Sequence, residues 1–167
     1  MSDHSSKPFL SKTAVGEPAT AAFGQALAPL LEPGDCVCLW GDLGMGKSTL
    51  ARSIIQATLG ADTDVPSPTF TLVQSYEIPD GEIWHMDLYR LEEPEDALEL
   101  GIEDAFADAV TLIEWPDRLG PWLPYDRLDL SIQQDGQAGE GARLITLSSQ
   151  DPRWATRLVG LVGDNSA

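Results

Sequence analysis

A glycine-rich loop with the pattern G-x-x-x-x-G-K-S occupies residues 41–48 of this 167-residue chain. An unbroken apolar run precedes it at residues 36–40, and apolar residues follow it at helical spacing, at Leu50, Ile54 and Ala57. A strand, such a loop and a helix form a P-loop, in which glycines let backbone N–H groups face one concavity at the positive end of the helix. The pattern therefore predicts a nucleotide site, and the alternative is a glycine-rich turn without a ligand.

Two side chains of this loop carry the expected chemistry. Lys47 adds a full positive charge for the β- and γ-phosphates, and the hydroxyl of Ser48 is suited to hold Mg²⁺. We expect both residues at the start of the helix that follows the loop.

Helical and strand-like patterns alternate along the rest of the chain. Helices are expected at residues 17–31, with a kink or an end at Pro29, and at residues 92–108, which Gly101 divides. Further strands are expected at residues 69–78, 82–88, 110–113, 126–133 and 142–147. The first two of these flank Pro79-Asp80-Gly81, which predicts an antiparallel hairpin.

These elements predict the α/β class, as a single P-loop NTPase domain over residues 1–167. We expect a mixed, mainly parallel sheet with flanking helices and an antiparallel hairpin. The core should span residues 8–160, with frayed ends at residues 1–6 and 163–167.

Acidic residues dominate the charge of the chain. There are 27 Asp and Glu against 10 Lys and Arg, so the formal net charge is −17. Binding to DNA, to an RNA backbone or to an anionic membrane needs clustered Lys and Arg, so this balance argues against such partners for the isolated chain.

The two cysteines, Cys36 and Cys38, are two residues apart in an apolar run and would point to the same face of a strand. We expect two buried free thiols in a reducing compartment, and no structural metal, because His4 and His85 are the only histidines. With no apolar run of about 18 residues and no apolar leader segment, a cytoplasmic protein is expected.

A P-loop enzyme also needs a carboxylate at the end of a neighbouring strand, and two residues qualify. Glu114 follows four apolar or small residues, the form of a buried strand that delivers one acid to its carboxyl end, and Asp87 ends the second strand of the hairpin. We prefer Glu114 as the acid on the metal side and Asp87 as a supporting or switch residue. For either one alone, a solvated acid at a strand end is the alternative.

Three neighbours of these acids complete the candidates. Thr69 lies between the P-loop helix and the hairpin, where it could reach a γ-phosphate or the metal. His85 is interpreted as a partly buried structural histidine, because the sequence reveals no hydrogen-bond partner for it. Trp115 directly follows Glu114 and should lie at the rim of the site.

Four motifs in this order and spacing closely resemble the TsaE (YjeE) family, over about residues 20–147. They are G-D-L-G-M-G-K-S at residues 41–48, S-P-T-F-T at 67–71, H-M-D-L-Y-R at 85–90 and L-I-E-W-P at 112–116. The family is a small P-loop ATPase that acts with TsaD and TsaB in the synthesis of N6-threonylcarbamoyladenosine at position 37 of tRNAs reading ANN codons. The resemblance implies the same function here, with ATP and Mg²⁺ as cofactors and tRNA handled by the partner proteins.

The resemblance also implies roles for single residues. Ser48 and Glu114 would serve Mg²⁺, and Lys47, Glu114, Asp87 and Thr69 would be the catalytic set, with Trp115 sensitive to change. Two departures from the family are mild: Met45 replaces a small residue, and Ser48 replaces the commoner Thr but keeps the hydroxyl. The nucleotide would be bound by Thr20 and by Asp42, Leu43, Gly44, Met45, Gly46, Lys47, Ser48 and Thr49.

An acidic strip extends from residue 92 to residue 108, with no basic residue between Arg90 and Arg118. It consists of Glu92, Glu93, Glu95, Asp96, Glu99, Glu103, Asp104 and Asp108. A solvated helix face is one interpretation, and a docking surface for a basic patch of TsaD or TsaB is the sharper one. Two other functions stay open: a kinase for a small metabolite or nucleoside, and a scaffold that binds ATP without useful hydrolysis.

Overall fold

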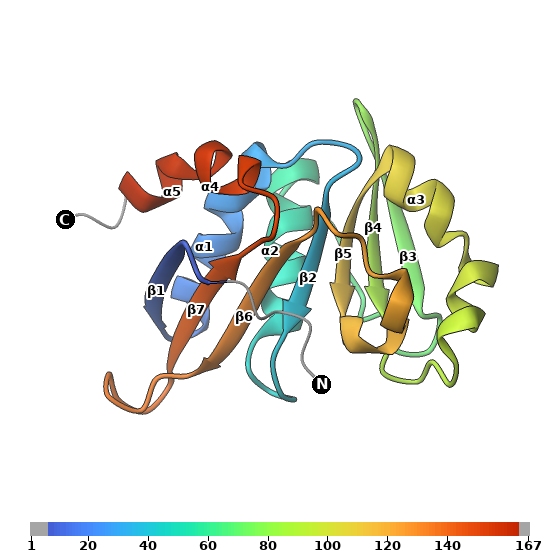
Figure 1. The fold of residues 1–167 in the computed structure, drawn as a ribbon. Coiled ribbons are helices and arrows are strands. Elements are labelled where there is room, and N and C mark those ends of the chain that lie inside the picture. The colour runs from blue at the N-terminus through green and yellow to red at the C-terminus, as the bar shows by residue number, and fades with distance from the viewer. Residues whose placement is uncertain (1–6, 164–167) are drawn as a thin grey trace.

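The computed structural model describes residues 7–163, in which a seven-stranded mixed sheet lies between two helical layers (Figure 1). The strand order is β1-β7-β6-β2-β5-β4-β3. The strands are β1 Leu10–Val15, β2 Cys36–Trp40, β3 Val73–Ile78, β4 Gly81–Asp87, β5 Ala109–Glu114, β6 Leu128–Gln134 and β7 Ala142–Ser148. Among residues 7–163, none of the helices combines the length and the apolar composition of a membrane-spanning helix.

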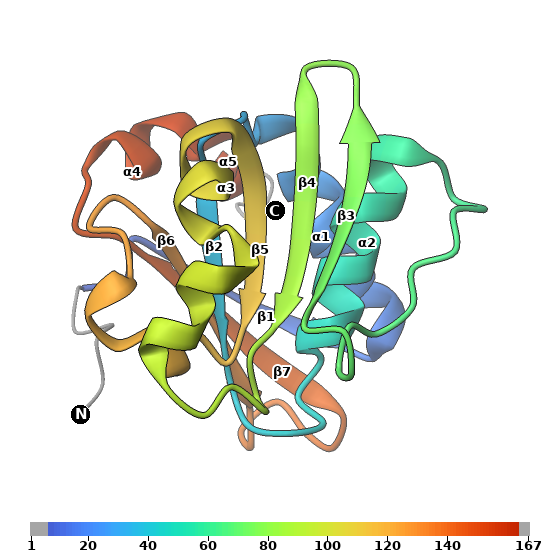
Figure 2. The same ribbon diagram turned by 90° about the vertical axis from the view of Figure 1, so that its right-hand side faces the viewer.

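The helices lie on both faces of the sheet (Figure 2). Helices α1 and α2 cover one face, whereas the 3₁₀ helix η2 and α3 cover the other. The α-helices are α1 Glu17–Leu27, α2 Lys47–Leu59, α3 Ile102–Asp108, α4 Arg153–Arg157 and α5 Val159–Gly163. The 3₁₀ helices are η1 Ala28–Leu30, η2 Pro94–Leu100 and η3 Pro116–Trp122.

The four central strands, β6, β2, β5 and β4, run parallel to one another, and antiparallel strands flank them. On one side β6 pairs with β7 and β7 with β1, and on the other β4 pairs with β3 in the expected hairpin. All five residues of β2 are buried, as expected of a strand covered on both faces. This arrangement is the predicted single α/β domain with a mixed sheet.

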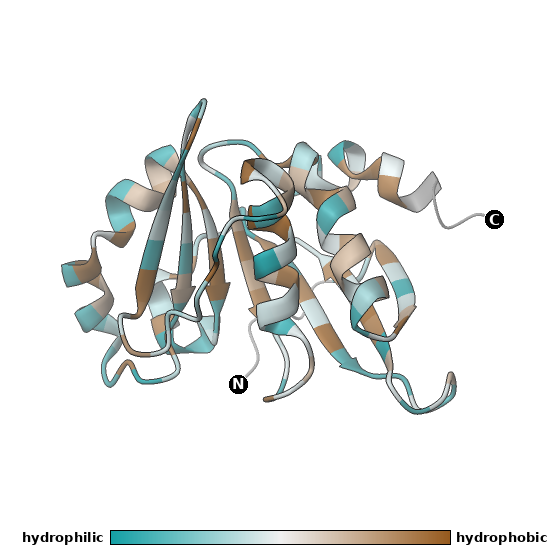
Figure 3. Ribbon diagram, turned by 180° about the vertical axis from the view of Figure 1, so that it is seen from behind, coloured by the Kyte–Doolittle hydropathy of each residue, from teal (hydrophilic) through white to brown (hydrophobic). Residues whose placement is uncertain are grey.

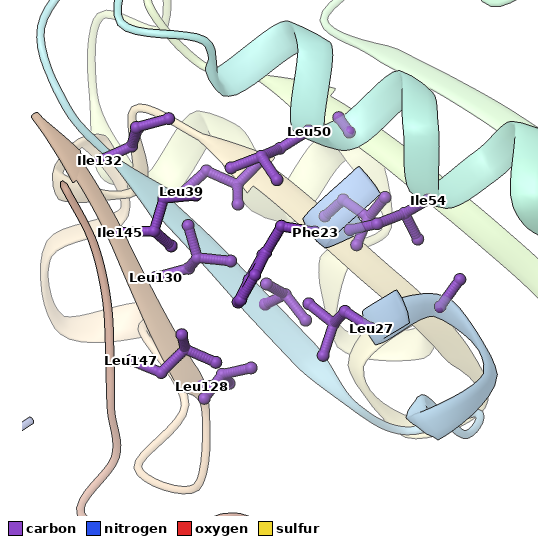
Figure 4. Packing of buried hydrophobic residues seen from close by; sticks show 14 of the residues in the cluster. Phe23, Leu27, Leu39, Leu50, Ile54, Leu128, Leu130, Ile132, Ile145 and Leu147 are labelled. Carbon is purple, nitrogen blue, oxygen red and sulfur yellow. The ribbon is translucent and has the colours of Figure 1, made fainter. Parts of the chain in front are cut away.

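Two hydrophobic clusters hold the layers together. In the first, Phe23 and Leu27 of α1 pack with Leu39 of β2 and with Leu50 and Ile54 of α2 (Figure 4). The second lies beneath η2, α3 and η3 and includes Cys38, Met86, Ile113 and Ile102. Seen from behind, much of the length of the central strands is apolar (Figure 3).

The two cysteines are free and buried, as predicted, with their sulfur atoms 3.8 Å apart. Burial raises the pKa of the Cys38 thiol, so this side chain stays protonated and packs as a small apolar group.

Several expected boundaries differ in the structure. The first helix ends at Leu27 and continues as η1, because Pro29 cannot extend an α-helix. Gly101 separates η2 from α3, as expected. The first strand of the hairpin begins at Val73 instead of residue 69, because residues 68–72 form a turn closed by the bond from the Leu72 N–H to the Pro68 carbonyl.

Some elements were not predicted at all. They are the edge strand β1, the 3₁₀ helix η3 and the terminal helices α4 and α5. Of the residues expected to fray, Gly163 ends α5, and residues 1–6 and 164–167 lie outside the described part of the chain.

Candidate nucleotide and metal site

The candidate site lies at the carboxyl edge of the parallel strands. Because β2, β4 and β5 run in the same direction, their last residues meet at one edge of the sheet. There Glu114 of β5 lies in register with Asp87 of β4 on one side and with Leu39 of β2 on the other. Side chains alternate along a strand, so Glu114 shares a face with Leu112, which packs in the same cluster as α2. The two candidate acids therefore face the start of α2.

The P-loop between β2 and α2 adopts the conformation that its glycines allow. Gly41, Gly44 and Gly46 have φ angles of 151°, 81° and 115°, in or near the left-handed region that L side chains avoid. A Cβ at Gly41 would lie 2.5 Å from the carbonyl oxygen of Ile132, so only glycine fits there. No side chain caps the N-terminus of α2, and its first N–H groups are free to bind an anion such as phosphate.

Lys47 begins α2 and folds back over the loop. Its Nζ donates hydrogen bonds to the carbonyl oxygens of Gly41 and Asp42 and lies 3.8 Å from the ring centroid of Trp115. Burial lowers the pKa of the Lys47 ammonium, while nearby carboxylates, Glu114 first, favour its charged form. A buried cation is thus held at the mouth of the loop.

Ser48 and Glu114 come together, although they are 66 residues apart in the sequence. The Ser48 hydroxyl donates to Oε1 of Glu114 at 3.1 Å and to Oε2 at 3.3 Å, and Glu114 is only 3% exposed. A hydroxyl and a carboxylate at the end of a phosphate loop fit Mg²⁺, which binds through one or two protein oxygens together with phosphates and water. The described residues contain no cluster of three or more His, Cys, Asp or Glu side chains that could hold a metal ion, so an ion here would take further ligands from the nucleotide and from water.

Thr69 and Asp87 form a second pair beside the first. The Thr69 hydroxyl donates to Oδ2 of Asp87 at 3.3 Å, and Oδ1 of Asp87 accepts the Tyr89 N–H at 3.1 Å. Asp87 is 7% exposed. Glu114 therefore contacts the P-loop hydroxyl directly, whereas Asp87 contacts the loop that carries Thr69.

The remaining candidates lie around the P-loop. Thr20 is buried on α1, and its hydroxyl donates to the Gly16 carbonyl at 3.4 Å. A cavity of about 200 Å³ is lined by Gly16, Glu17, Thr20, Gly44, Met45, Gly46, Thr49, Gly141 and Arg143. A larger cavity of about 540 Å³ is lined in part by Gly41, Asp42, Met45, Trp115 and Asp117. Leu43 is 69% exposed at the tip of the loop.

Arg143 is a contributor to the site that the sequence did not reveal. Its Nε donates to the Met45 carbonyl at 3.1 Å and its guanidinium also reaches the Gly44 carbonyl, so β7 supports the P-loop from outside. Arg143 and Met45 are 98 residues apart, and no local pattern links them.

His85 differs from what the sequence suggested. His85 is 1% exposed rather than partly buried, and it does have a partner: its Nε2 lies 2.7 Å from Oε2 of Glu114. Trp115, which was expected at the rim of the site, covers Lys47 and has a positive φ of 60°. Its ring packs against that of Tyr89 in a tilted arrangement, with ring centroids 5.0 Å apart. The sequence signal that could have placed His85 at the site is its spacing from Asp87. The two residues are two positions apart, so their side chains lie on the same face of β4.

Comparisons with known proteins show which family the sequence matches. The chain matches the family described as "Threonylcarbamoyl adenosine biosynthesis protein TsaE" over residues 15–144. Proteins named "tRNA threonylcarbamoyladenosine biosynthesis protein TsaE" are similar to it. The one from Rickettsia bellii is 42% identical over 117 residues, covering 70% of this chain and 81% of that protein. The one from Haemophilus influenzae is 44% identical over 134 residues, covering 77% and 82%.

A solved structure agrees as well. The crystal structure of Bacillus subtilis YdiB superposes with a TM-score of 0.78 at 27% sequence identity and covers 98% of this chain and 100% of that one. The family match spans the P-loop, the hairpin and the strand that ends at Glu114. The chain therefore belongs to the TsaE family, which is named for the biosynthesis of threonylcarbamoyladenosine.

Proposed function

We propose that this protein is a Mg²⁺-dependent ATPase that acts with TsaD and TsaB in forming N6-threonylcarbamoyladenosine at position 37 of tRNAs reading ANN codons. The observation that carries the proposal is the contact of the Ser48 hydroxyl with the Glu114 carboxylate, 3.1 Å apart, beside Lys47 and an uncapped helix N-terminus. Such an assembly supplies hydrogen-bond donors that can bind phosphates, and it supplies oxygen atoms that can coordinate a metal ion. Since tRNA is modified in the cytoplasm, we expect the protein to act there.

In this proposal each residue has a distinct task. Backbone N–H groups of residues 42–49 bind phosphate oxygens, and Lys47 exchanges its contacts with loop carbonyls for the β- and γ-phosphates. Ser48 and Glu114 hold the metal ion, and Asp87 with Thr69 responds to the γ-phosphate. A bound Mg²⁺-nucleotide would supply the phosphoryl group and part of the charge that stabilises its transfer. Thr20 lies in the cavity suited to the nucleoside, next to Thr49 and Gly46.

Replacement of Glu114 separates hydrolysis from binding. We expect the Glu114→Gln variant to release phosphate from ATP about 100-fold more slowly, because it loses the carboxylate charge, with a smaller effect on nucleotide affinity. Lys47→Ala should lose both activities. Unchanged turnover in Glu114→Gln, together with loss in Asp87→Asn, would assign the metal to Asp87 instead.

Phosphate release from Mg²⁺-ATP, measured with and without TsaD and TsaB, tests the proposed reaction. We expect slow release by the isolated protein and faster release with the partners. Transfer of labelled phosphate to a metabolite would indicate a kinase, and no release under any condition would indicate a scaffold. Nucleoside analysis of tRNA after depletion of the protein should reveal loss of threonylcarbamoyladenosine, and unchanged levels would contradict the proposed pathway role.

A further inference from the structure

The buried histidine beside Glu114 has no task in the scheme above. His85 lies in the middle of β4, where backbone pairing fixes it on both sides, to Gln74 of β3 and Leu112 of β5. Its Nε2 lies 2.7 Å from Oε2 of Glu114, and among the described residues its Nδ1 has no hydrogen-bond partner despite being buried.

The direction of this hydrogen bond follows from the chemistry of the two groups. An ionised carboxylate can only accept, so the Nε2–H of His85 donates to Glu114. Nδ1 then carries a lone pair, which costs less when left unpaired than a buried N–H without an acceptor would. Among the described residues, the one hydrogen bond of the His85 side chain therefore goes to the carboxylate proposed to hold the metal.

Glu114 needs such a restraint because two other groups attract it. Ser48 donates to both carboxylate oxygens, at 3.1 and 3.3 Å, and so does not select one of them. Among the carboxylates near Lys47, Glu114 contributes most to favouring the charged ammonium. Without a fixed donor on Oε2, the carboxylate would be free to turn toward Lys47, away from Ser48.

We propose that His85 is a positioning residue whose Nε2–H holds Oε2 of Glu114, so that Oε1 stays beside Ser48 in the orientation needed for a divalent cation. This inference rests on the proposed function of the site. Groups that orient metal ligands in this way typically contribute 10- to 100-fold to metal affinity or activity. Their own anchoring on a rigid element is what makes the orientation reliable.

Two replacements separate the hydrogen bond from the packing of the ring. Gln carries its Nε2 the same number of bonds from the backbone as His and can donate to Glu114, whereas Met has similar length but no donor. The measurement is calorimetric binding of the non-hydrolysable analogue β,γ-imido-ATP, once with MgCl₂ and once with EDTA. The quantity compared is the gain in affinity that Mg²⁺ brings, which does not depend on turnover.

We expect the gain in affinity for the analogue on adding Mg²⁺ to be about 10-fold smaller in His85→Met than in the wild type, and His85→Gln to keep most of this gain. In EDTA, all three proteins should bind the analogue equally. An unchanged gain in His85→Met, an equal loss in EDTA, or no rescue by Gln would overturn the positioning role. If His85→Met does not fold, His85→Asn replaces it, because its shorter amide cannot reach Oε2. Failure of the wild-type protein to bind the analogue would instead contradict the proposed function, and with it this inference.

Discussion

At the scale of single residues, the site keeps groups that the fold would be more stable without. Lys47 is a nearly fully buried cation whose contacts are two carbonyl oxygens and the face of Trp115. Trp115 itself adopts a left-handed backbone conformation with φ of 60°, which is costly for a bulky residue. Both residues border the same phosphate loop, where strain of this kind is typical of functional sites.

The buried ammonium makes stability depend on pH in a defined direction. The pKa of Lys47 in the folded protein is lowered from its ordinary value of 10.5 by burial. Between the two values the unfolded chain binds a proton that the folded chain does not, so the free energy of unfolding rises with pH there. In Lys47→Met this rise should be absent, and any stability advantage over the wild type should shrink as the pH approaches 10.5.

Urea unfolding of the nucleotide-free protein at a series of pH values from neutral upward checks this prediction. Lys7→Met, at an exposed position, serves as the matched control and should follow the wild type. If the free energy of unfolding of Lys47→Met changed with pH in the same way as that of the wild type, burial of Lys47 would not be the cause of the pH dependence.

At the scale of elements, the close contact between α1 and α2 fixes where the P-loop helix lies. Gly24 of α1 faces α2 so closely that a Cβ there would overlap the Ser53 hydroxyl and lie 3.1 Å from the Leu50 carbonyl. The same interface buries Phe23, Leu27 and Ile54 (Figure 4). A small residue at the crossing point is thus what lets the two helices approach each other.

Gly24→Ala should separate these helices and lower the free energy of unfolding by about 1–3 kcal/mol, as overpacking does. Ser53→Ala removes the hydroxyl that would collide first, so the double variant Gly24→Ala/Ser53→Ala should recover part of the loss. Gly136→Ala, which has open space around it, is the control. Chemical denaturation of the wild type, the two single variants and the double variant measures the coupling between the two positions. Strict additivity of the changes in the free energy of unfolding would argue against this contact as the cause.

At the scale of the whole molecule, the densest run of acidic residues in the sequence lies on one layer. All eight carboxylates of the acidic strip at residues 92–108 are exposed on or beside η2 and α3. This layer covers the opposite face of the sheet from α1 and α2 (Figure 2). These eight of the 27 acidic residues therefore lie on a separate surface from the uncapped N-terminus of α2.

Self-repulsion within this strip should make the protein more stable as salt is added. Raising the ionic strength from about 0.01 M to about 0.1 M shortens the screening length from about 30 Å to about 10 Å. The free energy of unfolding of the wild type should rise over this range. A Glu99→Gln/Asp108→Asn variant loses two negative charges at the C-terminal ends of η2 and α3, which themselves carry partial negative charge. This variant should be more stable than the wild type at low salt, and its stability should depend less on salt. An equal response of both proteins in denaturation curves would contradict this origin.

The same strip is the candidate surface for a basic partner. Changing Glu92, Glu93, Glu95 and Asp96 to Lys should abolish or strongly weaken capture of the protein by TsaD and TsaB in a pull-down. A control variant with two charges reversed outside the strip, at Glu77 and Glu82 of the hairpin, should be captured as the wild type is. Complex formation that survives the first change would leave the strip as a solvated helix face.

Much of this architecture was predictable because its signals are local. The apolar run at residues 36–40, the glycine pattern and the helix after it predicted β2, the P-loop and α2 in the right order. The hairpin turn and the division at Gly101 were also correct, since turn chemistry acts within a few residues. The edge strand β1 was not predicted, because its pairing partner, β7, is more than 120 residues away in the sequence.

Local chemistry thus established the class of the domain, the phosphate loop and the two acids at neighbouring strand ends. Only the folded chain decided that Glu114 meets Ser48 across 66 residues, that His85 meets Glu114 across 29, and that Arg143 supports Met45 across 98. The reason is physical: backbone propensity is set by near neighbours, whereas side-chain partners depend on strand register and on how layers pack. Those are properties of the complete core, and they turn a recognisable loop into a candidate site.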